Sequence, residues 1–307
     1  MIYYLIIGIV FFGQLFPPII EGVNGSLVSS LDEYENVMMD VQETTNVVNS
    51  GPIKISESSG IHLTASSALV IDKATGKILF QKEPDSQRSI ASITKLMTAL
   101  VFLEHNPGFD QIGQIGVEEN SLEGSRIQVK SEDQMTVEDL FYASLVGSAN
   151  NATQALVHST GLTGEEFVLE MNKKAESLGM ENTMYIEPTG LNSGNVSTVG
   201  DLAKLAKVVF KKPEISDATT RKEHSFVTLG NKEFYKQISK NVLLDSYLNI
   251  TGAKTGFTYD AGYCLVLQAE NERGNEVIAI VLNSKSSDTR FQEIKALVTW
   301  TFDNFQW

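Results

Sequence analysis

The stretch SALVIDKATGKILFQK, residues 67–82, decides how the folded part of the chain begins. Its two flanks, residues 67–72 and 77–82, are short runs rich in apolar side chains, as expected of β-strands. The four residues between them, KATG, end in Gly76 and are typical of a turn. The stretch therefore predicts an antiparallel β-hairpin.

Helical spacing follows directly after this hairpin. From Ser92 to Val101, apolar side chains recur at intervals of three and four residues, which is the period of an amphipathic helix. Thr136 begins a second helix, because Asp139 stands three residues later and completes a capping box. The middle of the chain is predicted to stay rich in helices to about residue 212.

Strand patterns return near the end of the chain. Residues 261–270 and 276–283 are apolar runs separated by the turn ERGN at 272–275, and a last helix begins at Asp288. Strands at both ends with helices between them predict an α+β domain. Its antiparallel sheet combines segments from both chain ends, is flanked by helices, and carries an inserted helical subdomain.

Composition and charge exclude several classes of protein. The chain has 307 residues, 42% of them hydrophobic and 20% charged, which is ordinary for one large or two modest globular domains. Its net charge of −14 repels phosphate backbones, so we expect no nucleic-acid partner. The chain has one cysteine, so it cannot form an intrachain disulfide. Its four histidines contain no HxH or HxxxH pair, so we expect no zinc site. Cys264 is expected to be a buried apolar side chain.

The first sixty residues differ from the rest. Residues 1–20 carry no charged side chain and are almost continuously apolar from Ile2 to Phe12, which predicts a signal peptide or a short membrane anchor. Residues 21–60 are acidic and rich in Ser, Asn, Thr and Val, which predicts a flexible linker. Residues 61–307 form the predicted folded domain. We expect export to the extracytoplasmic side; cleavage stays open, because Val23-Asn24-Gly25 is a faint cleavage site.

Ser92-Ile93-Thr94-Lys95 opens the first predicted helix. Positions three apart lie on one side of a helix, so the Ser92 hydroxyl and the Lys95 amine come within reach of each other. A serine hydroxyl becomes a good nucleophile when a base takes its proton, and lysine is such a base when burial lowers its pKa. Alone, this spacing equally fits a serine cap followed by a solvated lysine.

Two further short motifs carry polar side chains. Ser148-Ala149-Asn150 follows an apolar helical segment at a predicted break between two helices, where polar side chains can point into a cleft. Lys254-Thr255-Gly256 precedes the strand at Ala261. Its lysine and threonine face opposite sides of a regular strand, and its glycine leaves room for a ligand backbone to lie against the chain. Each motif alone is weak.

Taken together, the three motifs resemble those of penicillin-binding proteins and class A β-lactamases, which carry S-x-x-K, S-x-N or S-D-N, and K-T-G in this order. The flanking residues are similar to the D-alanyl-D-alanine carboxypeptidase family of serine peptidases, over about residues 61–305. The stretches that carry this resemblance are SITKLMT (92–98), SANNA (148–152), LGM (178–180), PTGL (188–191) and KTGFT (254–258).

The resemblance implies a β-lactamase/transpeptidase-like fold and acyl transfer to a serine. Ser92 would attack the carbonyl of the penultimate D-alanine of a peptidoglycan stem peptide, and Lys95 would accept its proton. Ser148 would relay a proton toward the leaving amine, with Lys254 tuning that path. Water would then release the acyl-enzyme, and neither a metal nor an organic cofactor is needed. β-Lactam antibiotics would be covalent inhibitors.

The same resemblance implies how the substrate is bound. Asn150 would hold the substrate amide, and Lys254 and Thr255 would bind the terminal carboxylate. The backbone N–H groups of Ser92 and Phe257 would form the oxyanion hole.

Arg290 matches a family position associated with carboxylate recognition. A surface arginine in the first turn of the last helix is the alternative for this residue.

The main hypothesis is a carboxypeptidase that trims stem peptides, and three alternatives stay open. A D,D-endopeptidase would use the same chemistry on cross-linked peptides. A class A-like β-lactamase would need an E-x-x-L-N glutamate, and the nearest match, Glu187 to Asn192, is one residue too long. A non-catalytic penicillin sensor would acylate without turnover. Many family members continue into a second domain; here the chain ends at Trp307, so we expect any membrane tether at the amino terminus.

Overall fold

The computed structural model describes residues 51–131 and 133–307. The predicted amino-terminal segment and the linker up to residue 50 lie outside the described residues. The compact unit that contains the fold runs from Ser50 to Trp307. It therefore begins about ten residues before the predicted boundary at residue 61. Strand β1 (Ile53–Lys54) explains the difference, because it pairs with β13 (Phe305–Gln306) and is too short to leave a periodic pattern.

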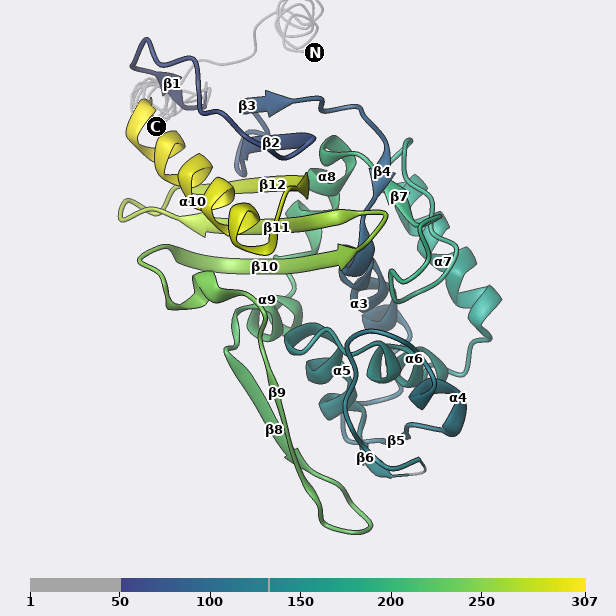
Figure 1. The fold of residues 1–307 in the computed structure, drawn as a ribbon. Helices are drawn as coiled ribbons and strands as arrows, with labels where there is room; N and C mark the ends of the chain where they lie inside the picture. Colours follow the sequence, from purple (N-terminus) through teal and green to yellow (C-terminus); the bar gives the residue numbers. More distant parts are fainter. Residues whose placement is uncertain (1–50, 132) are drawn as a thin grey trace, which may run out of the picture. The chain divides into compact units, whose positions relative to one another are not determined.

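A five-stranded antiparallel sheet forms the centre of this unit (Figure 1). Its strand order is β10-β11-β12-β2-β3, so the early hairpin and the late strands share one sheet, and the predicted α+β architecture is confirmed. The strands span Ser67–Asp72 (β2), Ile78–Lys82 (β3), Asn249–Thr258 (β10), Gly262–Glu270 (β11) and Glu276–Ser284 (β12).

The sheet is buried on both faces, and the alternation of side chains along each strand feeds two separate cores. Cys264 and Val266 of β11 pack into the core that contains most of the helices. Leu265 and Leu267, one position along, pack into the core under the last helix. This is why the late strands are continuously apolar in sequence, and the predicted burial of Cys264 is confirmed.

Helices cover both faces of the sheet, with α10 on one face and α8 on the other (Figure 1). The capping box at Thr136 and Asp139 forms as predicted and begins α5. The last helix begins one residue before the predicted Asp288, because the Ser286 hydroxyl accepts a hydrogen bond from the Thr289 N–H. The α-helices span Thr94–Glu104 (α3), Val117–Asn120 (α4), Val137–Val146 (α5), Asn150–Ser159 (α6), Gly164–Ser177 (α7), Val199–Val209 (α8), Pro213–Thr220 (α9) and Ser287–Asn304 (α10).

Short elements complete the unit. Two 3₁₀ turns, η1 (Ala91–Ile93) and η2 (Val242–Asp245), precede α3 and β10. Three further strand pairs are β4 (Arg88–Ser89) with β7 (Val196–Ser197), β5 (Ile112–Gln114) with β6 (Gln134–Thr136), and β8 (Glu223–Val227) with β9 (Phe234–Ile238).

The β8–β9 hairpin extends away from the central sheet (Figure 1). Its strands are absent from the sequence prediction, although their inward and outward side chains alternate with a period of two. Within the described part of the chain, no helix has both the length and the apolar character needed to cross a membrane.

Gly252 is a position in β10 at which a side chain has no room. A Cβ atom there would lie 2.4 Å from one carbon of the buried Phe210 ring. We expect Gly252→Ala to lower the free energy of unfolding by about 1–3 kcal/mol, because the ring must shift within a packed core. Gly164→Ala is the control: no atom lies within 4 Å of its Cβ position, in the first turn of α7. Urea denaturation would measure both, and equal stabilities would contradict this packing argument.

Candidate active site

The three sequence motifs meet at one pocket of about 260 Å³. Its walls come from η1, the junction between α5 and α6, strand β10 and the start of α10. Lys95 and Lys254 reach its serines with their ammonium groups. The other predicted site residues line the pocket directly: Ser92, Ser148, Asn150, Thr255, Gly256, Phe257 and Arg290.

The Lys95 side chain is held in place by burial and by three hydrogen bonds. It is fully buried, and its Nζ donates hydrogen bonds to Ser92 Oγ (3.1 Å), Asn150 Oδ1 (2.7 Å) and the Thr189 carbonyl (2.6 Å). Burial lowers the pKa of Lys95 to about 7, although the carboxylate of Glu187 opposes this effect. Near neutral pH a large share of Lys95 is therefore a free amine that can accept a proton from the Ser92 hydroxyl.

The backbones of two glycines pack closely against the segment that carries Ser92. A Cβ atom on Gly256 of β10 would lie 2.9 Å from the Ile90 carbonyl and 3.3 Å from the Ser92 N. On the other side, a Cβ atom on Gly190 would lie 2.0 Å from the Ala91 carbonyl and 2.8 Å from the Ser92 N. The glycine of K-T-G is thus needed for close approach of two backbones of the chain itself, whereas the sequence predicts room for a ligand backbone there.

Ser148 and Lys254 form a second pair of hydroxyl and ammonium. Lys254 Nζ donates to Ser148 Oγ at 2.9 Å and to the Thr255 carbonyl at 3.1 Å. Burial lowers the pKa of the Lys254 ammonium well below its ordinary value, and three neighbouring cations add to the effect. Those cations are Lys95, Lys240 and Arg290.

The backbone at Ser148 is left-handed, with φ of 58°, a conformation that costs a non-glycine residue about 1 kcal/mol. It follows the end of α5 and turns the hydroxyl into the pocket, where Lys254 binds it. Sequence inspection predicts a helix break here, and the structure confirms it.

The Asn150 side chain joins two walls of the pocket. Its Oδ1 accepts from Lys95, and its Nδ2 donates to the Glu123 carbonyl at 2.7 Å. The segment that follows, Gly124 and Ser125, lines the pocket. Asn150 therefore fixes the orientation of the lysine as well as the loop opposite β10.

Arg290 lines the pocket and is only 5% exposed, so the alternative of a surface arginine is wrong. Its guanidinium is buried and donates to the Gly256 carbonyl at 2.9 Å and to the Cys264 carbonyl at 3.4 Å. Its Nε has no hydrogen-bond partner among the described residues. Burial lowers the pKa of Arg290, yet a guanidinium stays charged at any physiological pH.

Lys240 is a charged pocket residue that the sequence analysis does not predict. It lies just after β9 and lines the pocket, as Arg290 does, and its side chain forms no hydrogen bond or ion pair within residues 51–131 and 133–307. Its charge lowers the pKa of both Lys95 and Lys254. No local motif marks it, because its position depends on how the β8–β9 hairpin folds back on the helices.

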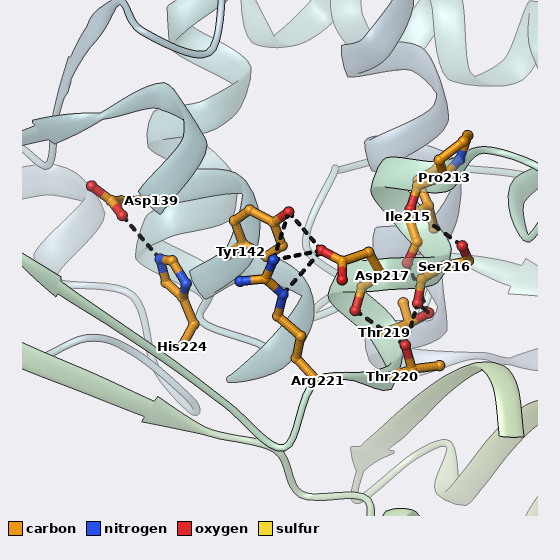
Figure 2. A network of polar contacts seen from close by, with 10 residues as sticks. All are labelled: Asp139, Tyr142, Pro213, Ile215, Ser216, Asp217, Thr219, Thr220, Arg221 and His224. Atoms are coloured by element: carbon orange, nitrogen blue, oxygen red, sulfur yellow. Dashed lines mark hydrogen bonds and ion pairs between the residues drawn. The ribbon is translucent and has the colours of Figure 1, made fainter.

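A polar and aromatic network attaches that hairpin to α5 and α9 (Figure 2). His224 of β8 binds Asp139 at 2.9 Å and stacks on the Tyr142 ring with 4.8 Å between centroids. The Arg221 guanidinium lies 4.1 Å from the same ring, and both Arg221 and Tyr142 donate to Asp217. Such a stack of cation and rings resists bending of the hairpin base.

This attachment fixes two pocket walls relative to each other. The Gln237 side chain of β9 lies against Gly147, so close that a Cβ atom on that glycine would be 2.1 Å from the amide oxygen. Gly147 precedes Ser148, and Lys240 follows β9 by two residues. The hairpin therefore positions Lys240 beside Ser148.

The donors that converge on the pocket are ammonium, guanidinium, hydroxyl and amide groups. Across the residues that the structure describes, no group of three or more His, Cys, Asp or Glu side chains is arranged to hold a metal ion.

Comparisons with known proteins identify the family of the chain. The sequence profile of a family described as D-alanyl-D-alanine carboxypeptidase matches residues 53–286. A D-alanyl-D-alanine endopeptidase of Pseudomonas aeruginosa is 35% identical over 271 residues, which is 86% of each chain. The D-alanyl-D-alanine carboxypeptidase DacF of Bacillus subtilis is 32% identical over 252 residues, 79% of this chain and 63% of the relative.

Solved structures give the same picture for the fold. The Streptomyces K15 DD-transpeptidase superposes with a TM-score of 0.74 at 28% identity, over 80% of this chain and all of that one. Penicillin-binding protein D2 of Listeria monocytogenes, in a cefotaxime-bound form, superposes with a TM-score of 0.70 at 31% identity. The β-lactamase/transpeptidase-like fold is thus confirmed.

The lowered pKa of Lys95 has a kinetic consequence. With free Lys95 amine as the base, acylation of Ser92 by benzylpenicillin should rise with pH through about 7 and then level off. Lys240→Gln removes a charge that lowers the Lys95 pKa, so its rising limb should move to higher pH. Stopped-flow acylation rates between pH 5 and 9 would measure both.

Lys236→Gln is the matched control, since Lys236 belongs to the same hairpin but pairs with Glu223. Its acylation rate should rise with pH over the same range as that of the wild type. A wild-type rate that does not vary with pH would contradict the role of Lys95 as the base, and an unmoved limb in Lys240→Gln would contradict the influence of Lys240.

Proposed function

Because the chain belongs to the D-alanyl-D-alanine carboxypeptidase family and is a serine-type enzyme of that family, we propose that it cleaves the terminal D-Ala–D-Ala bond of peptidoglycan stem peptides through an acyl-enzyme on Ser92. The observation that carries this assignment is the contact of Ser92 Oγ with Lys95 Nζ at 3.1 Å. The base is buried, and its pKa of about 7 suits proton transfer at neutral pH.

In the acylation step, Ser92 Oγ attacks the carbonyl carbon of the penultimate D-alanine while its proton passes to Lys95. The tetrahedral intermediate then collapses, the C–N bond breaks, and an ester to Ser92 remains. The leaving amine needs a proton. Ser148 supports that transfer, because its hydroxyl contacts Lys254 and lines the same pocket. Water then attacks the ester and regenerates Ser92.

The oxyanion of the tetrahedral intermediate requires donors in fixed positions. The Ser92 and Phe257 backbone N–H groups are the proposed pair, and the close packing of Gly256 on the Ser92 segment supports it. Removing one such donor in other acyl transferases costs about 3–4 kcal/mol of transition-state stabilisation.

The charge of the pocket suits a substrate that ends in a carboxylate. Arg290 and Lys240 line it beside Thr255, and Lys254 lies directly behind. Thr255 supplies the hydroxyl, and the cations supply the attraction that a free carboxylate requires. The same charge favours the carboxylate of a β-lactam, which would acylate Ser92 in place of the peptide.

Carboxypeptidase and D,D-endopeptidase activity share this chemistry and differ in the group that leaves. The relatives carry both names. A free D-alanine leaves in the first reaction, and the amine of a second stem peptide leaves in the second. We propose trimming of stem peptides as the main activity and cleavage of cross-links as the alternative.

Mass spectrometry after benzylpenicillin tests the proposal. The wild type should carry one adduct on Ser92. Ser92→Ala should lose the adduct and all peptide cleavage, and Lys95→Ala should lose at least about 100-fold in rate, which is the usual contribution of a general base.

Two substrates separate the activities: a pentapeptide ending in D-Ala-D-Ala, and a cross-linked muropeptide dimer. Release of D-alanine identifies the carboxypeptidase, and conversion of dimer to monomer identifies the endopeptidase. An adduct on another residue, or full activity of Lys95→Ala, would refute the assigned roles.

We propose further that the protein works outside the cytoplasmic membrane, where peptidoglycan lies, and that residues 1–20 direct its export or tether it there. The apolar composition of that segment supports this. Fractionation of cells that express the full chain should place it in the extracytoplasmic or membrane fraction, and deletion of residues 1–20 should leave it in the cytoplasm. A full chain found in the cytoplasm would contradict the proposal.

A further inference from the structure

We propose that Glu187 is a positioning residue for the acylation of Ser92: its carboxylate holds the loop of residues 187–195 against the start of α3, and that loop sets Lys95 and the backbone of Ser92. The inference rests on the proposed roles of Ser92 and Lys95. It assigns to Glu187 a function different from that of a glutamate that activates water.

The Glu187 carboxylate is occupied on both oxygens by its own loop. Oε2 accepts from the Thr189 N–H (2.7 Å) and the Thr189 hydroxyl (2.5 Å). Oε1 accepts from the Gly190 N–H (2.6 Å), the Asn195 amide (3.0 Å) and, at longer range, the Asn192 N–H (3.4 Å). A carboxylate offers about four lone-pair sites, so none is left to take a proton from a water molecule.

The loop in turn forms three hydrogen bonds with side chains in the first turns of α3. The Thr189 carbonyl accepts from Lys95 Nζ at 2.6 Å. The Pro188 carbonyl accepts from the Thr98 hydroxyl at 2.6 Å, and the Asn195 amide donates to the Thr94 hydroxyl at 3.1 Å. The carbonyl that orients the base therefore belongs to the residue that Glu187 binds with two hydrogen bonds.

The loop also packs closely against the backbone of Ser92, the proposed nucleophile. Gly190 has a φ of 85° and lies so close to the Ala91 carbonyl and the Ser92 N that no side chain fits between them. Its N–H is bound by Glu187. Loss of that carboxylate would release Gly190 and Thr189 together, and with them the backbone of Ser92 and the orientation of Lys95.

Charge gives Glu187 a second, measurable influence on Lys95. The titratable groups that act on the pKa of Lys95 are Glu187 from the loop and Lys240 after β9. Lys254 of β10 also faces Lys95, which lowers the pKa of Lys254. The facing groups on η1 and α6, Ser92 and Asn150, are neutral. Among these, Glu187 is the anion, and it raises the pKa of Lys95 against the effect of burial.

Two variants separate geometry from charge. Glu187→Gln removes the charge and turns an NH₂ group toward the loop donors. Glu187→Asp keeps the charge but shortens the side chain by one methylene. The rate constant for acylation by benzylpenicillin should fall about 10- to 100-fold in both, because small misplacement of catalytic groups costs this much. The acidic limb of the pH profile should move to lower pH in Glu187→Gln and stay in place in Glu187→Asp.

Asp201→Asn is the matched control. Asp201 is a buried carboxylate that also accepts from a loop, through the Asn182 N–H and the Thr183 hydroxyl, but it does not contact the pocket residues. This variant should melt at a lower temperature and keep the wild-type pH limb. A loss caused only by general destabilisation would affect it in the same way as Glu187→Gln.

The outcomes that overturn the inference are distinct from those that overturn the proposed function. If the wild type shows no adduct on Ser92, the proposed function fails and the inference with it. If Ser92 is labelled but folded Glu187→Asp and Glu187→Gln acylate at the wild-type rate, the positioning role is refuted. Normal acylation with a long-lived adduct in Glu187→Gln would instead make Glu187 the group that activates water. Should Glu187→Gln fail to fold, the rate of Glu187→Asp decides.

Discussion

The withdrawal of one ammonium group from water is the constraint on which the site depends. Lys95 lies at the start of α3 with no exposed surface, and all three of its N–H donors are used. An unpaired charge in such a place would cost several kcal/mol, so each acceptor must be held in position by other parts of the fold. Asn150 comes from α6, Thr189 from the loop before β7, and Ser92 from η1.

The architecture delivers these acceptors from distant parts of the chain. Strands from both ends build one sheet, whose alternating side chains fill a core on each face. The helical core carries α3, α5 and α6 as a rigid group, and the edge strand β10 lies against η1. The pocket lies where this edge strand meets the helices, so its geometry follows from packing rather than from any single motif.

The features that can be predicted from the sequence are those that depend on a few neighbouring residues. The hairpin at residues 67–82, the capping box at Thr136 and the three motifs of the site can be found in the sequence because each is a short pattern with a physical cause. Lys240 cannot be found this way, since its place depends on an aromatic stack between a hairpin and two helices. The part played by Glu187 is hidden for a similar reason: its partners are mostly backbone N–H groups, which every loop possesses.

The two glycines that enclose the Ser92 segment restrict which side chains the pocket can carry. A methyl group at Gly190 or Gly256 would overlap the backbone of the nucleophile, so neither position can acquire a side chain without damage to turnover itself. Other lining positions are more open, since Phe257 is 43% exposed and Leu191 is partly exposed, and these can accept other side chains. An inhibitor that contacts Gly190 and Gly256 would therefore bind positions that cannot change without a shift of the Ser92 backbone.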